Sequence, residues 1–394
     1  MTESFGDRLR RLRKEPAAPQ AETEASTERA ALPEWFRERL TKVVVEPKDA
    51  APATVSAGDP RELVDFASAR GAACARVTQW GLAHRHGAME LGSALRARPE
   101  DLALVGVDTR LAELSLERAL YLDIETTGLA GGAGTKAFLV GLGRFTGDGF
   151  ELWQGFLRGP EDEAALLDEC ARRVASAGAL VSFFGKSFDR HRLEDKMRLH
   201  CIDAPFERCL HLDLYHPCRR LYGAGLANGR LATMEREIAG VERPHDLPGA
   251  FAPAAWYDYL AGRAHRLEEV FEHNRDDILS LVAIASALAR LASDGAPSDL
   301  PSTRALALAR CAERVGRWRE CRRWCELALL DAEQAVEAVA LAARACEELA
   351  EEEAFDGLLA RARQLGASEL EARVERRRSR VLRRSRARAP EHGP

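Results

Sequence analysis

Two acidic residues, Asp123 and Glu125, close an apolar run that leads into a turn. In a β-strand, side chains two residues apart point to the same face, so these carboxylates are expected side by side. Adjacent carboxylates repel and raise each other's pKa unless a cation neutralises them. Mg²⁺ takes oxygen ligands of this kind, often together with substrate phosphates. The pair predicts half of a metal site for phosphoryl transfer; the alternative is a buried strand that ends in a solvated acidic turn.

Further acidic positions follow later in the chain. Asp189 falls in the first turn of an expected helix, with Ser187 as its expected N-cap. His273 and Asp277 are four residues apart on one face of another expected helix, so both can face a single centre. The alternatives are a capping role for Asp189 and a surface pair for the other two. Asp276, turned ~100° away on its helix, is expected in solvent.

The elements that must carry these residues alternate between strands and helices. The expected strands are residues 119–125, 138–145, 150–153 and 179–184. The expected helices are residues 161–175, 187–200, 231–238, 253–261 and 265–291. Three strands, a helix, a strand and a helix in succession describe an RNase H-like α/β core. The glycine-rich residues 128–134 precede a strand rather than a helix, which favours a hairpin turn over a phosphate-binding loop.

Four short motifs in this order resemble the DEDD superfamily of 3′–5′ exonucleases, and most closely its predicted YprB-type RNase H-like branch. They are Asp-Ile-Glu-Thr-Thr-Gly-Leu at residues 123–129, Gly-Lys-Ser-Phe-Asp at 185–189, His-Leu-Asp-Leu at 211–214 and His-Asn-Arg-Asp-Asp-Ile at 273–278. The resemblance covers residues 118–293, less than half of the chain. It implies a mixed RNase H-like sheet with flanking helices that hydrolyses terminal phosphodiesters of single-stranded DNA or RNA.

The resemblance also implies a role for each acid. Asp123 would bridge two Mg²⁺ or Mn²⁺ ions, with Glu125 and Asp277 completing the shell of the first ion. Asp189 would hold the second ion, at the ~4 Å spacing of two-metal sites. His273 stands where related exonucleases carry the Tyr or His that orients or deprotonates the attacking water. No organic cofactor is implied. The expected substrate contacts are Thr126, Phe184, Lys186 and His211.

Phe184 departs from the family pattern, in which many members carry an Asn at this position. An apolar side chain cannot replace the polar substrate contact of that Asn, and it either stacks on a base or fills the core. This departure keeps open a second interpretation, a fold that holds nucleic acid or a protein partner with little turnover. The clustered carboxylates favour the enzyme, because a pure binding protein has no need of them.

A third class of function, a zinc-organised interaction module, would use a group of cysteines and histidines. These residues are Cys201, Cys209, His211, His216 and Cys218. Their spacing does not match the close ligand pairs of structural zinc sites, so zinc is not expected.

The remaining segments are assigned by composition and periodicity. Residues 1–60 are expected to be a disordered tail, and residues 61–118 an adaptor, with a short helix over 61–68, packed on an exonuclease domain at 119–293. Residues 300–370 are expected to form tetratricopeptide-like helical hairpins, which either dock a protein partner or only pack on the exonuclease domain. The arginine-rich residues 371–394 are expected either to contact nucleic acid or to be a solvated helix end.

The composition of the 394 residues is that of a globular protein, with 46% hydrophobic residues and a net charge of -5. No global basic field exists, so any nucleic-acid surface must be local. Nine cysteines without a paired framework suit a reducing compartment. The first residues lack a signal-peptide core, and no run of ~18 apolar residues occurs, which predicts a cytoplasmic protein without a membrane span.

Overall fold

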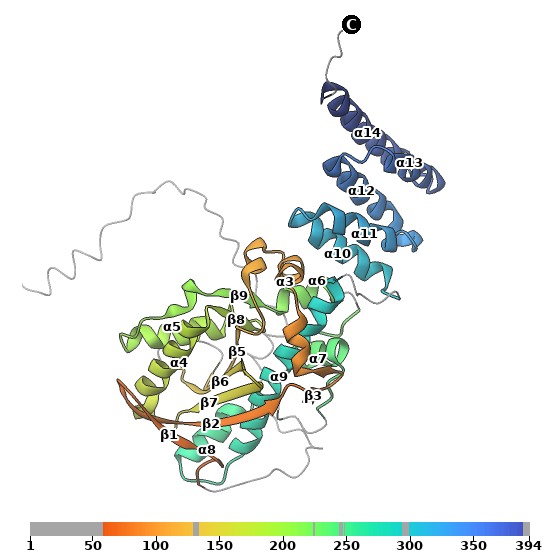
Figure 1. Cartoon of the computed structure of the whole chain (residues 1–394). Helices are drawn as coiled ribbons and strands as arrows, with labels where there is room; N and C mark the ends of the chain where they lie inside the picture. The colour runs from red at the N-terminus through yellow and green to blue at the C-terminus, as the bar shows by residue number, and fades with distance from the viewer. Residues whose placement is uncertain are drawn as a thin grey trace, which may run out of the picture.

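The computed structural model describes residues 58–128, 134–223, 225–243, 247, 249–293 and 299–388. Its centre is a seven-stranded sheet in the order β1-β2-β7-β6-β5-β8-β9 (Figure 1). The strands are β1 (Val64–Ser68), β2 (Gly71–Gly81), β5 (Leu120–Thr126), β6 (Ala137–Thr146), β7 (Gly149–Phe156), β8 (Ala179–Ser182) and β9 (Leu210–Asp213). The pairs β5–β8 and β8–β9 are parallel and the others antiparallel, which confirms the expected mixed sheet.

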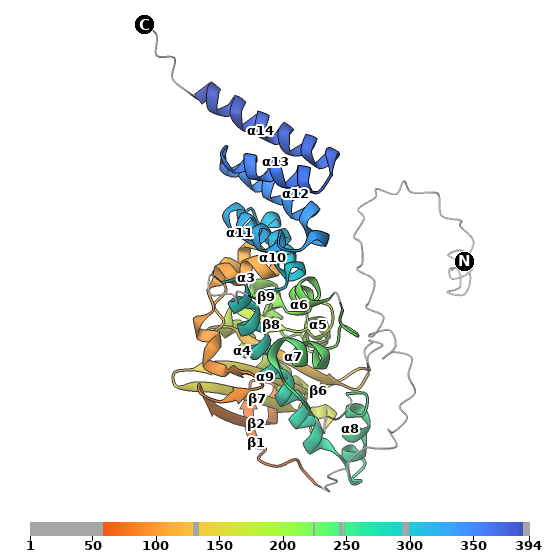
Figure 2. The ribbon, with the colours of Figure 1, turned by 90° about the vertical axis from the view of Figure 1, so that its right-hand side faces the viewer.

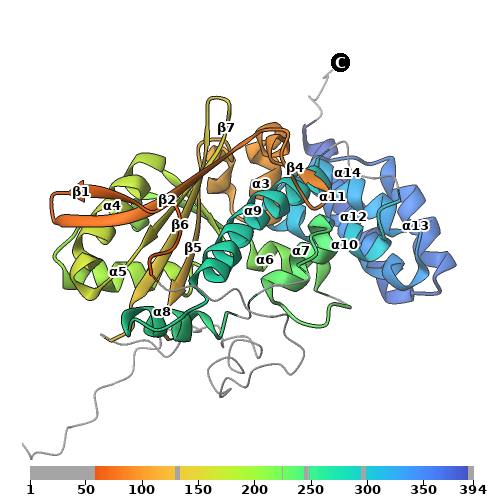
Figure 3. The same cartoon turned by 90° about the horizontal axis from the view of Figure 1, so that it is seen from below.

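Helices flank this sheet on both faces. The helices that precede residue 300 are α3 (Pro99–Gly106), α4 (Glu163–Ala177), α5 (Asp189–Leu199), α6 (Tyr215–Tyr222), α7 (Leu231–Ala239), α8 (Ala252–Leu260) and α9 (Leu267–Ala292). The 3₁₀ turns are η1 (Leu91–Arg96), η2 (Thr109–Glu113), η3 (Pro160–Asp162) and η4 (Pro205–Arg208), and a small hairpin pairs β3 (Arg85–His86) with β4 (Met89–Glu90). Figure 3 shows α9 between the sheet and α7, and α9 packs on both.

The two faces of β5 belong to different parts of the core. Leu120, Leu122 and Ile124 are packed in the core cluster that includes α4, α5 and α8. Tyr121 lies in the other cluster, with most of α9. Because side chains alternate along a strand, Asp123 and Glu125 share the face of Tyr121. The strand therefore directs both carboxylates toward α9.

Residues 61–118 supply part of the sheet itself. The helix expected over residues 61–68 is wrong, because Val64–Ser68 forms the edge strand β1 and pairs with β2. β2 in turn pairs with β7, from Cys74 opposite Phe156 to Gly81 opposite Gly149. Pairing with residues distant in the chain overrides the local helical spacing here.

The helices expected around the acidic motifs are present with small shifts. Residues 231–238, 253–261 and 265–291 correspond to α7, α8 and α9. The expected N-cap is wrong, because α5 begins at Asp189 and Phe188 occupies the cap position without a side-chain hydrogen bond. The glycine-rich turn falls largely on residues 129–133, outside the described residues.

An all-helical region follows the sheet. Its helices are α10 (Ser302–Arg314), α11 (Trp318–Ala328), α12 (Ala332–Leu349), α13 (Ala354–Gln364) and α14 (Ser368–Arg388). They pair as antiparallel neighbours and extend away from the sheet (Figure 2), while α10 packs on α3 and α6. Trp324 of α11 is fully buried among them. Helical hairpins are thus confirmed, and their tetratricopeptide-like character stays a prediction.

The expected tail at the N-terminus lies outside the described residues as far as residue 57, and so do residues 389–394 of the basic C-terminal segment. Within the described part of the chain, no helix has the length and apolar character needed to cross a membrane.

Candidate active site

Three carboxylates, from β5, α5 and α9, act electrostatically on Asp123. Asp123 and Glu125 end β5, Asp189 opens α5, and Asp277 lies on α9. Burial raises the pKa of Asp123 well above its ordinary value, and the negative charges of Asp277, Asp189 and Glu125 raise it further. The register of β5 against β6 shifts between Glu125 and Thr126, an irregularity of the kind that often re-aims side chains next to active sites. The fold therefore concentrates negative charge around the Asp123 carboxyl group.

Asn274 fixes the orientation of Asp123. Its Nδ2 donates to Asp123 Oδ2 at 2.8 Å, and its Oδ1 accepts from Gln154 Nε2 at 2.9 Å. Gly141, directly opposite Asp123 in β6, makes room for this amide, because a Cβ there would lie 2.4 Å from Asn274 Oδ1. Asn274 is completely buried. Residue spacing did not reveal Asn274, Gln154 or Gly141 as supports of the site, although Asn274 lies inside the last acidic motif.

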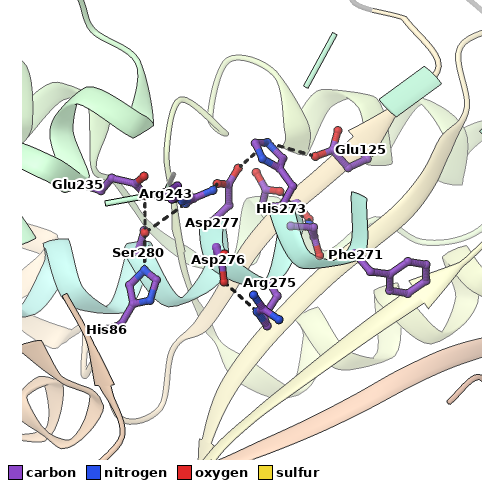
Figure 4. A network of polar contacts seen from close by, with 12 residues as sticks. His86, Glu125, Glu235, Arg243, Phe271, His273, Arg275, Asp276, Asp277 and Ser280 are labelled. Atoms are coloured by element: carbon purple, nitrogen blue, oxygen red, sulfur yellow. Dashed lines mark hydrogen bonds and ion pairs between the residues drawn. The ribbon is translucent and has the colours of Figure 1, made fainter. Parts of the chain in front are cut away.

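His273 stands between two of the acids (Figure 4). Its Nε2 is 3.8 Å from Glu125 Oε1 and 3.6 Å from Asp277 Oδ2. Both distances exceed those of a direct hydrogen bond. The His273 side chain is mostly buried, and a short gap separates its Nε2 from each of the two carboxylates. Asp276 points elsewhere, as its helical position predicts, but it is only partly exposed and pairs with Arg275.

Arg243, which follows α7, contacts the fourth acid and was not anticipated. Its Nη1 lies 2.7 Å from Asp277 Oδ1, and its Nη2 lies 2.6 Å from Glu235 Oε2 (Figure 4). Nothing in the local pattern around residue 243 marks it, because the contact joins the segment after α7 to the middle of α9. The positive charge of Arg243 therefore offsets part of the negative charge of the carboxylates.

Asp213 holds the loop that delivers Asp189. Its Oδ1 accepts the backbone N–H of Phe184 at 2.7 Å, and its Oδ2 accepts that of Lys186 at 3.1 Å. Between them, Gly185 passes so close that a Cβ would lie 2.4 Å from Ser182 Oγ and 3.2 Å from Asp189 Oδ2. Phe184 has a φ of 61°, in the left-handed region. These contacts tie the end of β9 to the start of α5.

The four expected substrate contacts are mostly internal. Phe184 is 7% exposed and packs edge-on against Tyr215, so it fills the core rather than offering a face to a base. Thr126 is buried and donates its hydroxyl to the Gly128 carbonyl. Burial lowers the pKa of His211 to about 3, and its Nε2 lies 2.7 Å from Ser182 Oγ. Lys186 is half-buried, and burial lowers its pKa.

The side chains around the acids have the chemistry of metal ligands, but in this structure they lie too far apart to enclose an ion. No three His, Cys, Asp or Glu side chains of the described residues converge closely enough to enclose an ion, and this includes the cysteines and histidines considered for zinc. At the acids, Asn274 and Arg243 engage Asp123 and Asp277 instead. The donor chemistry nonetheless fits a hard divalent cation, since carboxylate oxygens predominate and the charge stress on Asp123 is of the kind a cation relieves.

Comparison with known proteins gives a similarity for this part of the chain. Residues 120–289, less than half of the chain, match the family model described as the RNase_H superfamily, so this segment is similar to the domains of that superfamily. A curated relative is "Uncharacterized protein YprB" of Bacillus subtilis (strain 168), 30% identical over 217 residues. The alignment covers 53% of this chain and 51% of that protein, so the chain spans about half the length of the relative it matches.

Proposed function

We propose that the chain is a divalent-metal-dependent 3′–5′ exonuclease acting on single-stranded nucleic acid. The observation that carries the proposal is the arrangement of Asp277, Asp189 and Glu125 around the partly buried Asp123, whose pKa their negative charges raise. Such a concentration of like charge is unfavourable by itself and becomes useful when cations and a phosphate enter. The similarity to RNase H superfamily domains adds a general expectation of nucleic-acid processing.

The proposed ion ligands are the four acids Asp123, Glu125, Asp189 and Asp277. Ions bound there would supply the chemistry of two-metal sites, namely activation of water and stabilisation of charge on the phosphate and the leaving 3′ oxygen. Asn274 keeps Asp123 in one orientation through its 2.8 Å hydrogen bond. Asp213 does the same indirectly for Asp189, because it binds two backbone N–H groups of the preceding loop.

His273 is the proposed proton acceptor. Its Nε2 faces both Glu125 and Asp277 at distances too long for direct hydrogen bonds, which suits a water molecule shared with the acids. Imidazole titrates near pH ~6.5 and accepts a proton readily at neutral pH, whereas a tyrosine does not. The ring would take the proton of the attacking water and release it to solvent afterwards.

Digestion of end-labelled oligonucleotides tests the function. We expect 5′-labelled single-stranded DNA or RNA to shorten stepwise from the 3′ end in the presence of Mn²⁺ or Mg²⁺, and to stay intact with a chelator. An otherwise identical oligonucleotide that ends in a 3′-phosphate is the matched control, because it tests whether degradation depends on the 3′ end. Cleavage inside the strand would contradict the exonuclease, and tight binding without any cleavage would favour the scaffold function instead.

The outer face of α14 is expected to bind the phosphate backbone. Four arginines on it are exposed and fall within a ~100° arc of the helix, namely Arg373, Arg376, Arg383 and Arg384. Others on α14 are already paired, as Arg377 and Arg380 are with Glu347. Changing the four to Gln is expected to weaken oligonucleotide binding and to lower the slope of log affinity against log salt by up to ~3, because fewer counterions are released.

Fluorescence anisotropy over a salt series measures this effect. The matched control removes four exposed arginines outside α14, namely Arg118, Arg290, Arg314 and Arg319. A loss of binding as large in the control as in the α14 variant would show a response to net charge alone.

A further inference from the structure

Arg243 is anchored to two carboxylates at once. One guanidinium nitrogen, Nη1, pairs with Asp277 Oδ1 at 2.7 Å, and the other, Nη2, pairs with Glu235 Oε2 at 2.6 Å. The arginine side chain is 8% exposed, and that of Glu235 is 2% exposed. Removing one partner from an ion pair that is shielded from water is costly, because it leaves an uncompensated charge. The arginine thus links a carboxylate of the proposed ion site to one outside it.

The contacts of Glu235 hold the guanidinium in place from behind. Ser280 Oγ donates to Glu235 Oε2 at 2.5 Å, and Arg243 Nη2 reaches the same hydroxyl at 3.3 Å. His86 Nε2 lies 2.8 Å from Ser280 Oγ (Figure 4). Burial lowers the pKa of His86 to about 4, so its ring is neutral near pH 7. The positive charge of this network therefore resides on Arg243.

The position of Arg243 sets it in competition with a divalent ion. A cation bound through Asp277 Oδ1 would share that oxygen with a guanidinium nitrogen 2.7 Å from it, and two positive charges at such separations repel strongly. Glu235 offers the guanidinium a second partner, so Arg243 can give up Asp277 without being left unpaired. Arg243 therefore opposes ion binding at Asp277, and Glu235 allows the guanidinium to release Asp277 when an ion binds.

We propose that Arg243 is a counter-cation built into the site: it neutralises Asp277 while no divalent ion is bound, and it lowers the affinity of the acids for that ion. The proposal rests on the ion site of the proposed function. It explains how Asp277 is stabilised in the ion-free fold beside the other acids. It also makes Arg243 a positioning residue, since it acts through Asp277 and Glu235.

The test measures Mn²⁺ binding by the full chain without nucleic acid, from the electron paramagnetic resonance signal of free Mn²⁺. Arg243→Gln is expected to bind Mn²⁺ at least ~10-fold more tightly, because a neighbouring unit charge is removed at short range. Glu235→Gln is expected to bind it more weakly, because the guanidinium loses the carboxylate of Glu235 and is held more firmly by Asp277. A change that merely damaged the fold would weaken binding in both variants.

Arg275→Gln is the matched control. This substitution also removes one positive charge, in this case from α9. Arg275 pairs with Asp276 rather than with Asp277, so Mn²⁺ affinity should stay near that of the wild type. Unchanged or weaker binding by a folded Arg243→Gln protein overturns the proposal. Should that variant not fold, Glu235→Gln decides alone, and an unchanged or higher affinity there overturns it. Absence of Mn²⁺ binding in every protein overturns the ion site itself, whereas equal binding in every protein overturns only the role of Arg243.

Discussion

Asp123→Asn is expected to abolish nuclease activity while making the ion-free protein more stable. The substitution keeps the shape of the side chain and an oxygen that can accept from Asn274, but removes the charge that the other acids oppose. We expect the rate to fall at least ~10³-fold, or ~4 kcal/mol of transition-state stabilisation. In the presence of a chelator, relief of ~1 kcal/mol of repulsion would raise Tm by ~2–4 °C. The opposite signs of the two effects separate a functional loss from a folding defect.

The measurement pairs single-turnover digestion with thermal unfolding of chelator-treated protein. Asp276→Asn is the control, because it makes the same change one residue before Asp277, at a carboxylate that pairs with Arg275. We expect that variant to digest DNA or RNA at a rate close to that of the wild type. Equal losses of activity in the Asp123→Asn and Asp276→Asn proteins would contradict a role for the charge of Asp123 in the reaction.

The strand-borne part of the site was predictable because its signal is local. The spacing of Asp123 and Glu125 needs only the alternation of side chains in β5 to place both on one face. Asp277 and His273 needed only the period of a helix, and the order of strands and helices then indicated that their elements belong to one RNase H-like core. The first two steps used residues within about ten positions of one another, and only the order of the elements needed the whole segment.

The residues that orient the acids were missed because their contacts are made only in the folded chain. Arg243 reaches Asp277 from the segment after α7, and nothing near residue 243 distinguishes it from a surface arginine. Gln154 reaches Asn274 from β7, across 120 positions of sequence. The edge strand β1 was missed for a related reason, since its five residues take their conformation from pairing with β2. The role of Phe184 could not be predicted for the same reason, because only its packing against Tyr215 in the folded chain distinguishes core filling from base stacking.

Asn274→Asp is expected to destabilise the ion-free protein strongly, although the two side chains have nearly the same shape. It places a carboxylate oxygen where the amide nitrogen now lies, 2.8 Å from Asp123 Oδ2, in a position without solvent exposure. Of the three hydrogen bonds that hold the amide, the two that its nitrogen donates to Asp123 are lost, and only the one from Gln154 survives. An uncompensated charge buried in this way costs ~3–5 kcal/mol, or else one of the two carboxyl groups must bind a proton.

Urea unfolding with a chelator, and again with Mn²⁺, measures this effect. Asn228→Asp is the control for the same substitution, because Asn228 Oδ1 only accepts hydrogen bonds, from the Arg230 N–H and the Thr233 hydroxyl, and a carboxylate can accept both. We expect the stability lost at residue 274 to be partly restored by Mn²⁺, since an ion near Asp123 would offset the added charge. A loss in the chelated protein no larger than that of Asn228→Asp would contradict the close contact between Asn274 and Asp123, and with it the orientation of the acid on which the proposed chemistry depends.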